Sequence, residues 1–161
     1  MAVRRLLGAI AVVVALLAIA SAAFVGTASA KDYKVGESAH SGDLIFTVYG
    51  FTDPHVSSNL RIFPVAGHHY VVVYVGVKNP SKRRQSYITT RSFQLVDKTG
   101  EQYDMTFSDL PEPDEDIPGK VAVRGYASFS IPDNAPGPMR FRAQRNGKGP
   151  ATYWGLTPPP Q

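Results

Sequence analysis

The sequence predicts an all-β protein that folds as an antiparallel β-sandwich, and two observations carry that prediction. After residue 30, apolar and polar side chains alternate with a period of two and no helical period appears, which indicates strands. Glycine, proline, asparagine and aspartate interrupt the alternation about every 8–12 residues, a spacing typical of sandwiches. The expected elements follow from these two patterns.

The first 30 residues have the features of a secretory signal peptide. Arg4 and Arg5 form a short basic start, residues 6–25 are almost entirely apolar, and Ala28-Ser29-Ala30 is the small-residue pattern that precedes cleavage at Lys31. The apolar run is also long enough to span a bilayer, so an uncleaved anchor is the alternative. We therefore expect a secreted or extracytoplasmic protein, or else one anchored in a membrane through residues 6–25.

Residues 31–156 are expected to form one domain, followed by a proline-rich tail at 157–161. Removing Arg4 and Arg5 lowers the number of Lys and Arg from 17 to 15 against 13 Asp and Glu, so the net charge falls from +4 to +2. An exported protein with so small a charge is not expected to bind nucleic acid. The chain has no cysteine, which excludes disulfides, a lipid-modified cysteine, a thiolate nucleophile and a cysteine-based zinc site.

About seven strands account for the alternation. They are expected at residues 33–35, 44–49, 68–78, 93–95, 103–107, 121–131 and 139–144. The turn Asp97-Lys98-Thr99-Gly100 fits a short hairpin whose glycine takes the left-handed conformation. Residues 146–161 are rich in glycine and proline, which predicts an ordered strap followed by a loose tail. This pattern of strands predicts an immunoglobulin-like β-sandwich.

Two adjacent histidines, His68 and His69, precede the apolar part of the longest strand. Successive side chains on a strand point to opposite faces, so His69 shares the core face with the alternate valines Val71 to Val77. The two rings therefore diverge, whereas a metal site needs ligands that converge. We expect His69 to be partly buried at the entry of the strand and not to bind a metal ion.

Three stretches, HYVVVYVGVKNPS, SFQLVDKTGEQYD and IPGKVAVRGYASFSIP, resemble a family of secreted immunoglobulin-like domains of unknown function whose name mentions a telomeric-repeat-binding factor. The chain is also similar in architecture to the immunoprotective extracellular antigens of actinobacteria. The landmarks of the resemblance are Lys78-Asn79, Val96-Asp97 to Gly100, Pro118-Gly119 and Ile131-Pro132. The resemblance covers residues 35–156 and implies a β-sandwich outside the cytoplasm, but it implies no activity.

No enzyme is predicted, and neither a cofactor nor a metal ion is expected. The chain lacks the G-x-S-x-G pattern of a hydrolase nucleophile. Five carboxylates lie in the loop 109–116, which makes a calcium-binding module the less favoured alternative because the EF-hand spacing is missing. Lys82-Arg83-Arg84 is interpreted as a solvated turn, with contact to anionic lipid or cell-wall polymer as the alternative.

The predicted function is an exported binding or envelope-associated module without catalytic activity; the alternative is a membrane-anchored structural ectodomain. The expected partner is an extracellular protein or an anionic envelope polymer, with membrane contact only if the N-terminal segment stays uncleaved. If the longest strand pairs with the last two strands, one outer face collects residue types that are enriched in interfaces. The candidate binding residues are Tyr70, Tyr74, Arg124, Tyr126, Arg140 and Arg142. The competing interpretation of this face is an ordinary solvated sheet.

Overall fold

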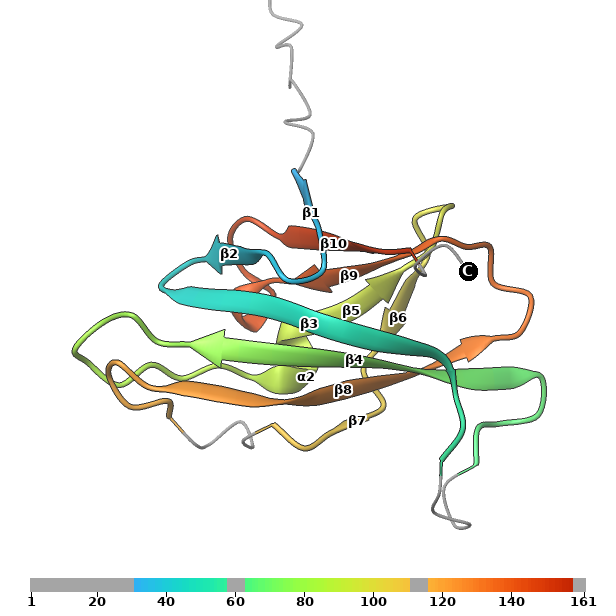
Figure 1. The fold of residues 1–161 in the computed structure, drawn as a ribbon, viewed down its shortest axis with the longest axis horizontal. Helices are drawn as coiled ribbons and strands as arrows, with labels where there is room; N and C mark the ends of the chain where they lie inside the picture. The colour runs from blue at the N-terminus through green and yellow to red at the C-terminus, as the bar shows by residue number, and fades with distance from the viewer. Residues whose placement is uncertain (1–30, 58–62, 111–115, 158–161) are drawn as a thin grey trace, which may run out of the picture.

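The computed structural model describes residues 31–57, 63–110 and 116–157, which form two five-stranded β-sheets packed face to face (Figure 1). The first sheet has the order β1 (Asp32–Tyr33), β10 (Thr152–Leu156), β9 (Met139–Ala143), β5 (Phe93–Val96) and β6 (Gln102–Asp104). The second has the order β2 (Ser38–Ser41), β3 (Leu44–His55), β4 (His68–Lys78), β8 (Ala122–Pro132) and β7 (Phe107–Ser108). A short helix, α2 (Thr89–Ser92), and a 3-10 turn, η1 (Arg145–Gly147), connect strands. The predicted all-β sandwich is confirmed.

The described residues contain ten strands where about seven were expected. The missed strand β2 is short and polar, and β10 lies in the segment that was predicted to be a strap. The expected strand 103–107 is in fact two strands, β6 and β7, which belong to different sheets. Alternation of side chains is preserved when a chain crosses from one sheet to the other, so the pattern alone does not reveal the crossing.

The core lies between the two sheets and confirms the predicted faces of the longest strand. Val71, Val73, Val75 and Val77 are all fully buried. The opposite sheet contributes Phe93, Phe141 and Trp154, whose rings contact one another with Phe141 in the centre. The indole nitrogen of Trp154 donates a 2.9 Å hydrogen bond to the Glu37 carbonyl oxygen, which satisfies the one polar group of this side chain.

The hairpin after β5 forms as predicted, with Gly100 in the left-handed region at φ 93°. It is organised by Asp97, which is 1% exposed. One carboxylate oxygen accepts hydrogen bonds from the backbone and hydroxyl of Thr99 and from the Glu101 backbone, and the other accepts the Tyr103 hydroxyl. These bonds, that of the Thr99 hydroxyl foremost, hold the pKa of Asp97 below its usual value.

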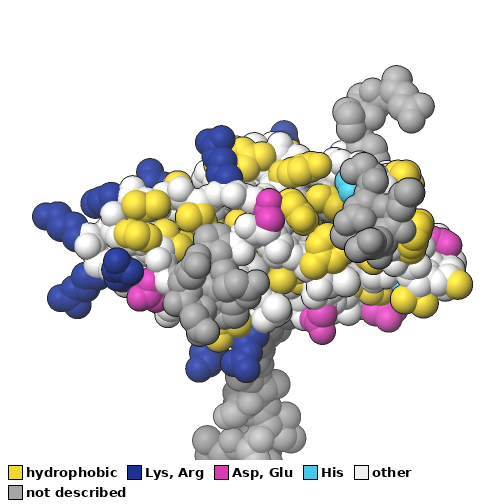
Figure 2. Space-filling model, turned by 90° about the horizontal axis from the view of Figure 1, so that it is seen from below, with side chains coloured by type: hydrophobic (Ala, Val, Ile, Leu, Met, Phe, Trp, Pro, Cys, Tyr) yellow, Lys and Arg dark blue, Asp and Glu magenta, His cyan; other side chains and the backbone are white. Residues whose placement is uncertain are grey.

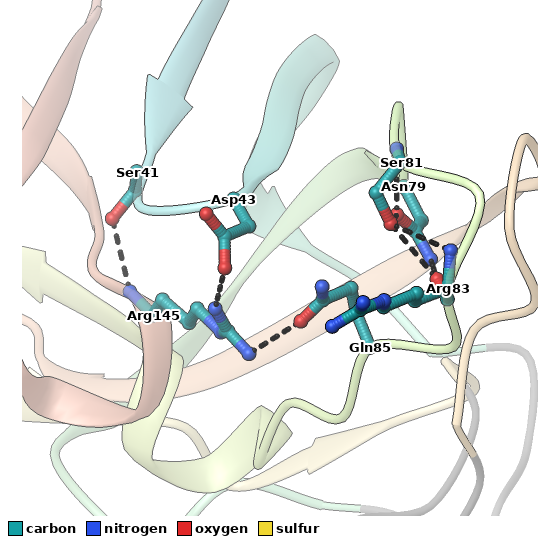
Figure 3. Close-up of polar contacts among 7 residues, drawn as sticks. All are labelled: Ser41, Asp43, Asn79, Ser81, Arg83, Gln85 and Arg145. Carbon is teal, nitrogen blue, oxygen red and sulfur yellow. Dashed lines mark hydrogen bonds and ion pairs between the residues drawn. The ribbon is translucent and has the colours of Figure 1, made fainter.

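The landmark residues Asn79 and Gly119 close one end of the second sheet. The buried Asn79 amide donates to the Arg83 carbonyl oxygen, and its oxygen accepts hydrogen bonds from the backbone and hydroxyl of Ser81 (Figure 3). The amide also donates to the carbonyl oxygens of Ile117 and Pro118. At Gly119 an added Cβ would lie 2.5 Å from the carbonyl carbon of Lys82, so only glycine allows the two backbones to approach so closely. These landmarks therefore fix the loop that contains Lys82, Arg83 and Arg84.

Candidate binding surface

Four of the six predicted binding residues share the outer face of the second sheet. Tyr70 and Tyr74 lie on β4, and Arg124 and Tyr126 lie on the neighbouring strand β8. Tyr74 lies directly opposite Tyr126, and Gly76 lies opposite Arg124. The prediction that these four residues belong to one face is thus confirmed.

Arg140 and Arg142 do not belong to this face, and the prediction that placed them there was wrong. Their strand β9 pairs with β5 and β10 in the first sheet, on the other side of the sandwich. Arg140 lies 3.7 Å from the Asp32 carboxylate and stacks over the Tyr153 ring. Arg142 donates hydrogen bonds to Gln94 and Gln144. The alternation of side chains along a strand shows which residues face the core and which face solvent, but it does not show which of the two sheets the strand joins.

Tyr70 lies on the predicted face but is 7% exposed, so it is not available to a ligand. The ring of Phe107, from the edge strand β7, packs against Tyr70 at 5.4 Å between centroids. The Tyr70 hydroxyl donates to the Phe63 carbonyl oxygen at 3.1 Å. Beneath this cover, Val72 and Ser128 are also buried although they point away from the main core. One half of the outer face is therefore closed.

The other half is open and contains a tyrosine that was not among the predicted site residues. Tyr49 is 47% exposed and Tyr74 is 43% exposed. The register of β3 against β4 shifts between Val48 and Gly50, and this bulge leaves Tyr49 as an extra residue on the outer face. Tyr49 is the last residue of the predicted strand 44–49, and nothing in the alternation indicated a bulge there.

The ring of Tyr49 lies across Gly76 and beneath the guanidinium group of Arg124. A Cβ at position 76 would be 2.7 Å from Cε2 of Tyr49, so the ring can occupy this position because residue 76 has no side chain. The Arg124 guanidinium carbon is 4.5 Å from the Tyr49 ring centroid, which is cation–π distance. We call Tyr49, Gly76, Tyr74, Arg124 and Tyr126 the tyrosine–arginine platform.

The platform adjoins a group of positive charges at the end of the sheet where β4 ends and β8 begins. The exposed basic residues of this basic end are Lys78, Lys82, Arg83, Arg84, Lys120 and Arg124. Figure 2 shows Lys and Arg side chains gathered mainly at the left end of the molecule. None of the six forms an ion pair within the described residues, whereas Arg145 nearby is paired with Asp43 at 2.8 Å (Figure 3).

The other sites considered from the sequence are a calcium site in the acidic loop 109–116 and a membrane-spanning helix. Residues 111–115 of the acidic loop lie outside the described residues, so the calcium hypothesis stays a prediction. At its start, Asp109 accepts a hydrogen bond from the Tyr126 backbone. In the described ranges no three His, Asp or Glu side chains are grouped so that they could hold a metal ion. No helix there is long and apolar enough to cross a membrane.

Comparisons with known proteins agree with the fold. A secreted protein of Mycobacterium tuberculosis, MPT63, has a TM-score of 0.55 and 15% identity, over 80% of this chain and 99% of the other. The yjhA protein of Bacillus subtilis gives 0.58 and 16%, over 78% and 99% of the two chains. An uncharacterized β-sandwich protein of Clostridium difficile gives 0.51 and 14%, over 80% and 96%. No curated protein matches. The family described as "Domain of unknown function (DUF4352)" matches residues 33–145, and the chain belongs to it.

Proposed function

We propose that this protein is an exported, non-catalytic binding module whose tyrosine–arginine platform and basic end together bind an anionic polymer of the cell envelope. The observation that carries the proposal is the Arg124 guanidinium held on the exposed Tyr49 ring, beside cations that have no ion pair among the described residues. Export is supported by the signal-peptide pattern of residues 1–30 and by the structural similarity to a secreted protein.

The platform suits binding because its side chains are already ordered. Stacking on Tyr49 restricts the long Arg124 side chain, so less conformational entropy is lost when a ligand binds. The guanidinium edge still has N–H groups that fork onto a carboxylate or phosphate. Tyr74 adds apolar area with a hydroxyl at its tip, which is the character of interface residues.

The charge distribution favours a polymer over a single small anion. The six cations extend along one end of the sheet, so neighbouring acidic groups of a repeating ligand can each approach one of them. Exposed charges contribute mainly to the rate and specificity of association, and salt screens them over about 8 Å at physiological ionic strength. Binding is therefore expected to weaken as salt is added.

The decisive experiment reverses one charge on the platform and one elsewhere. Arg124→Glu should weaken cosedimentation with isolated cell envelopes about fivefold to tenfold at low salt, because roughly 1–1.4 kcal/mol of binding energy corresponds to that factor. The matched control is Lys98→Glu, since Lys98 is also exposed but lies in the hairpin after β5, a strand of the opposite sheet, and its backbone bonds to Pro136 in the turn after β8, at the other end of the sandwich. Equal binding by both variants and the wild type would remove the platform from consideration.

The alternative is a structural ectodomain held by an uncleaved N-terminal helix over residues 6–25. Sequencing the N-terminus of the native protein separates the two functions. A chain that starts at Lys31 and is recovered from the medium supports release. Recovery only from membranes, with Met1 or Ala2 intact, supports the anchored ectodomain.

A further inference from the structure

A second site lies at the opposite end of the sandwich from the basic end. A pocket of about 420 Å³ opens where β3 and β8 end and β4 and β9 begin. Its apolar lining includes Ile131, Ala135, Met139 and Leu156. The polar side chains in the lining are Asp53, His69 and Asp133, and no lysine or arginine of the described chain lines it.

His69 is held between the two carboxylates. Its Nε2 atom is 3.0 Å from Oδ1 of Asp53, and its Nδ1 atom is 3.0 Å from Oδ1 of Asp133. The ring is 25% exposed, which agrees with the predicted partial burial at the strand entry. The two carboxylates come from the end of β3 and from the turn after β8, so their approach to His69 depends on the packing of distant segments.

The carboxylates have more acceptor capacity than the histidine can fill. An imidazole ring provides at most two N–H donors, whereas two carboxylates present four oxygens, each with two lone pairs. Within the described residues no other side chain donates to Asp53 or Asp133. A ligand with N–H donors and a positive charge would fill the free lone pairs of the two carboxylates, whereas the carboxylates would repel an anion.

From these features we infer that the pocket binds a primary alkylammonium group, with the alkyl part on the apolar lining and the ammonium at the carboxylate lone pairs of Asp53 and Asp133 that His69 does not fill. A quaternary ammonium group fits less well, because it has no N–H donors and the described lining contains no Phe, Tyr or Trp to form an aromatic cage. The ligand could be a free alkylamine or the lysine side chain of a peptide. This inference does not depend on the platform.

The test is a titration of the protein with n-hexylammonium, followed by NMR chemical shifts and calorimetry. We expect saturable binding that shifts the resonances of His69 and Met139, and no comparable binding of n-hexanol, hexanoate or hexyltrimethylammonium. Binding of Nα-acetyl-lysine amide more tightly than hexylammonium would identify a lysine side chain as the ligand, and the reverse order a free amine. Equal binding of hexanol and hexylammonium, or no binding of any amine, would overturn the inference.

Substitutions test the carboxylates and the apolar lining of the pocket independently. Asp53→Asn combined with Asp133→Asn should weaken hexylammonium binding at least tenfold, while Asp116→Asn, an exposed carboxylate at the other end, should leave it unchanged. Ala135→Leu fills the pocket but keeps both carboxylates, so it tests the apolar part even if the double variant is unstable. Ala135→Leu with wild-type affinity would show that the pocket is not the binding site.

Discussion

The side-chain amide of Asn79, at the end of β4, donates a 2.9 Å hydrogen bond to the backbone carbonyl of Ile117, which lies before β8. The same amide also bonds to two other carbonyl oxygens, and Asn79 is fully buried. Asn79→Ala would remove the amide that bonds to these three carbonyl oxygens and the oxygen that accepts from the backbone and hydroxyl of Ser81. Because several buried hydrogen bonds are lost together, it should lower the free energy of unfolding by about 2–3 kcal/mol. Urea unfolding measures this, with Ser81→Ala as a control that should cost only about 1 kcal/mol. A loss below about 0.5 kcal/mol in Asn79→Ala would contradict the structural role.

Gly76→Ala tests the platform without changing any charge. The new Cβ would displace the Tyr49 ring, and with it the stacked Arg124 guanidinium. Because the clash involves the end of a surface side chain, the free energy of unfolding should change by less than about 1 kcal/mol. Envelope binding should nevertheless fall. Gly155→Ala, where an added Cβ meets nothing within 4 Å, should alter neither quantity.

Substitutions at two adjacent positions of β4 test the assignment of its faces. Val73→Asp should unfold the domain, because a buried unpaired carboxylate costs about 3–5 kcal/mol against a total stability of about 5–15 kcal/mol. Tyr74→Asp puts the same side chain on the open face and should cost about 1 kcal/mol. Circular dichroism and thermal unfolding distinguish the two. A folded Val73→Asp variant would be incompatible with this register.

The buried carboxylate of Asp97 makes the free energy of unfolding of the domain depend on pH in the acid range. Its pKa is lower in the folded state than in the unfolded chain, where a free aspartate has a pKa of about 3.9. The stabilisation is therefore complete above about pH 4 and is lost as the pH falls through the folded pKa. Asp97→Asn should lower the urea midpoint at pH 7, and this difference from the wild type should shrink at pH 3. Thr99→Val, which removes one hydroxyl donor, should show a smaller effect of the same form, and a pH-independent difference would contradict the assignment.

The faces of the long strands could be predicted because burial on one side imposes a period of two. Val71, Val73, Val75 and Val77 on β4 all lie on the predicted core face, and the alternate residues Phe129 and Ile131 of the neighbouring strand β8 are buried with them. The assignment of strands to sheets could not be predicted in this way. Arg142 alternates correctly with its neighbours on β9, yet it lies on the opposite side of the sandwich from Arg124, since turn geometry and long-range pairing decide which sheet a strand joins.

The residues of the candidate sites could be predicted only in part from the sequence, for the same reason. Tyr74, Arg124 and Tyr126 are close because β4 and β8 pair over their full length, which the two long alternating segments made plausible. The bulge that presents Tyr49 and the approach of Asp53 and Asp133 to His69 depend on contacts between segments separated by up to 64 residues. No local pattern encodes such contacts.

Trp154 belongs to the strand that follows all the others, and this has a consequence for the order of folding. β1, at the start of the described chain, pairs in parallel with β10, and the Tyr33 ring packs on Trp154 at 5.6 Å. Synthesis proceeds from the N-terminus, so β1 has no partner and the first sheet has no closed core until residues 152–156 emerge. The nascent domain thus remains without its final packing until translation has passed these residues. If the protein is exported as proposed above, this delayed closure keeps the chain from becoming compact while it passes through a membrane channel.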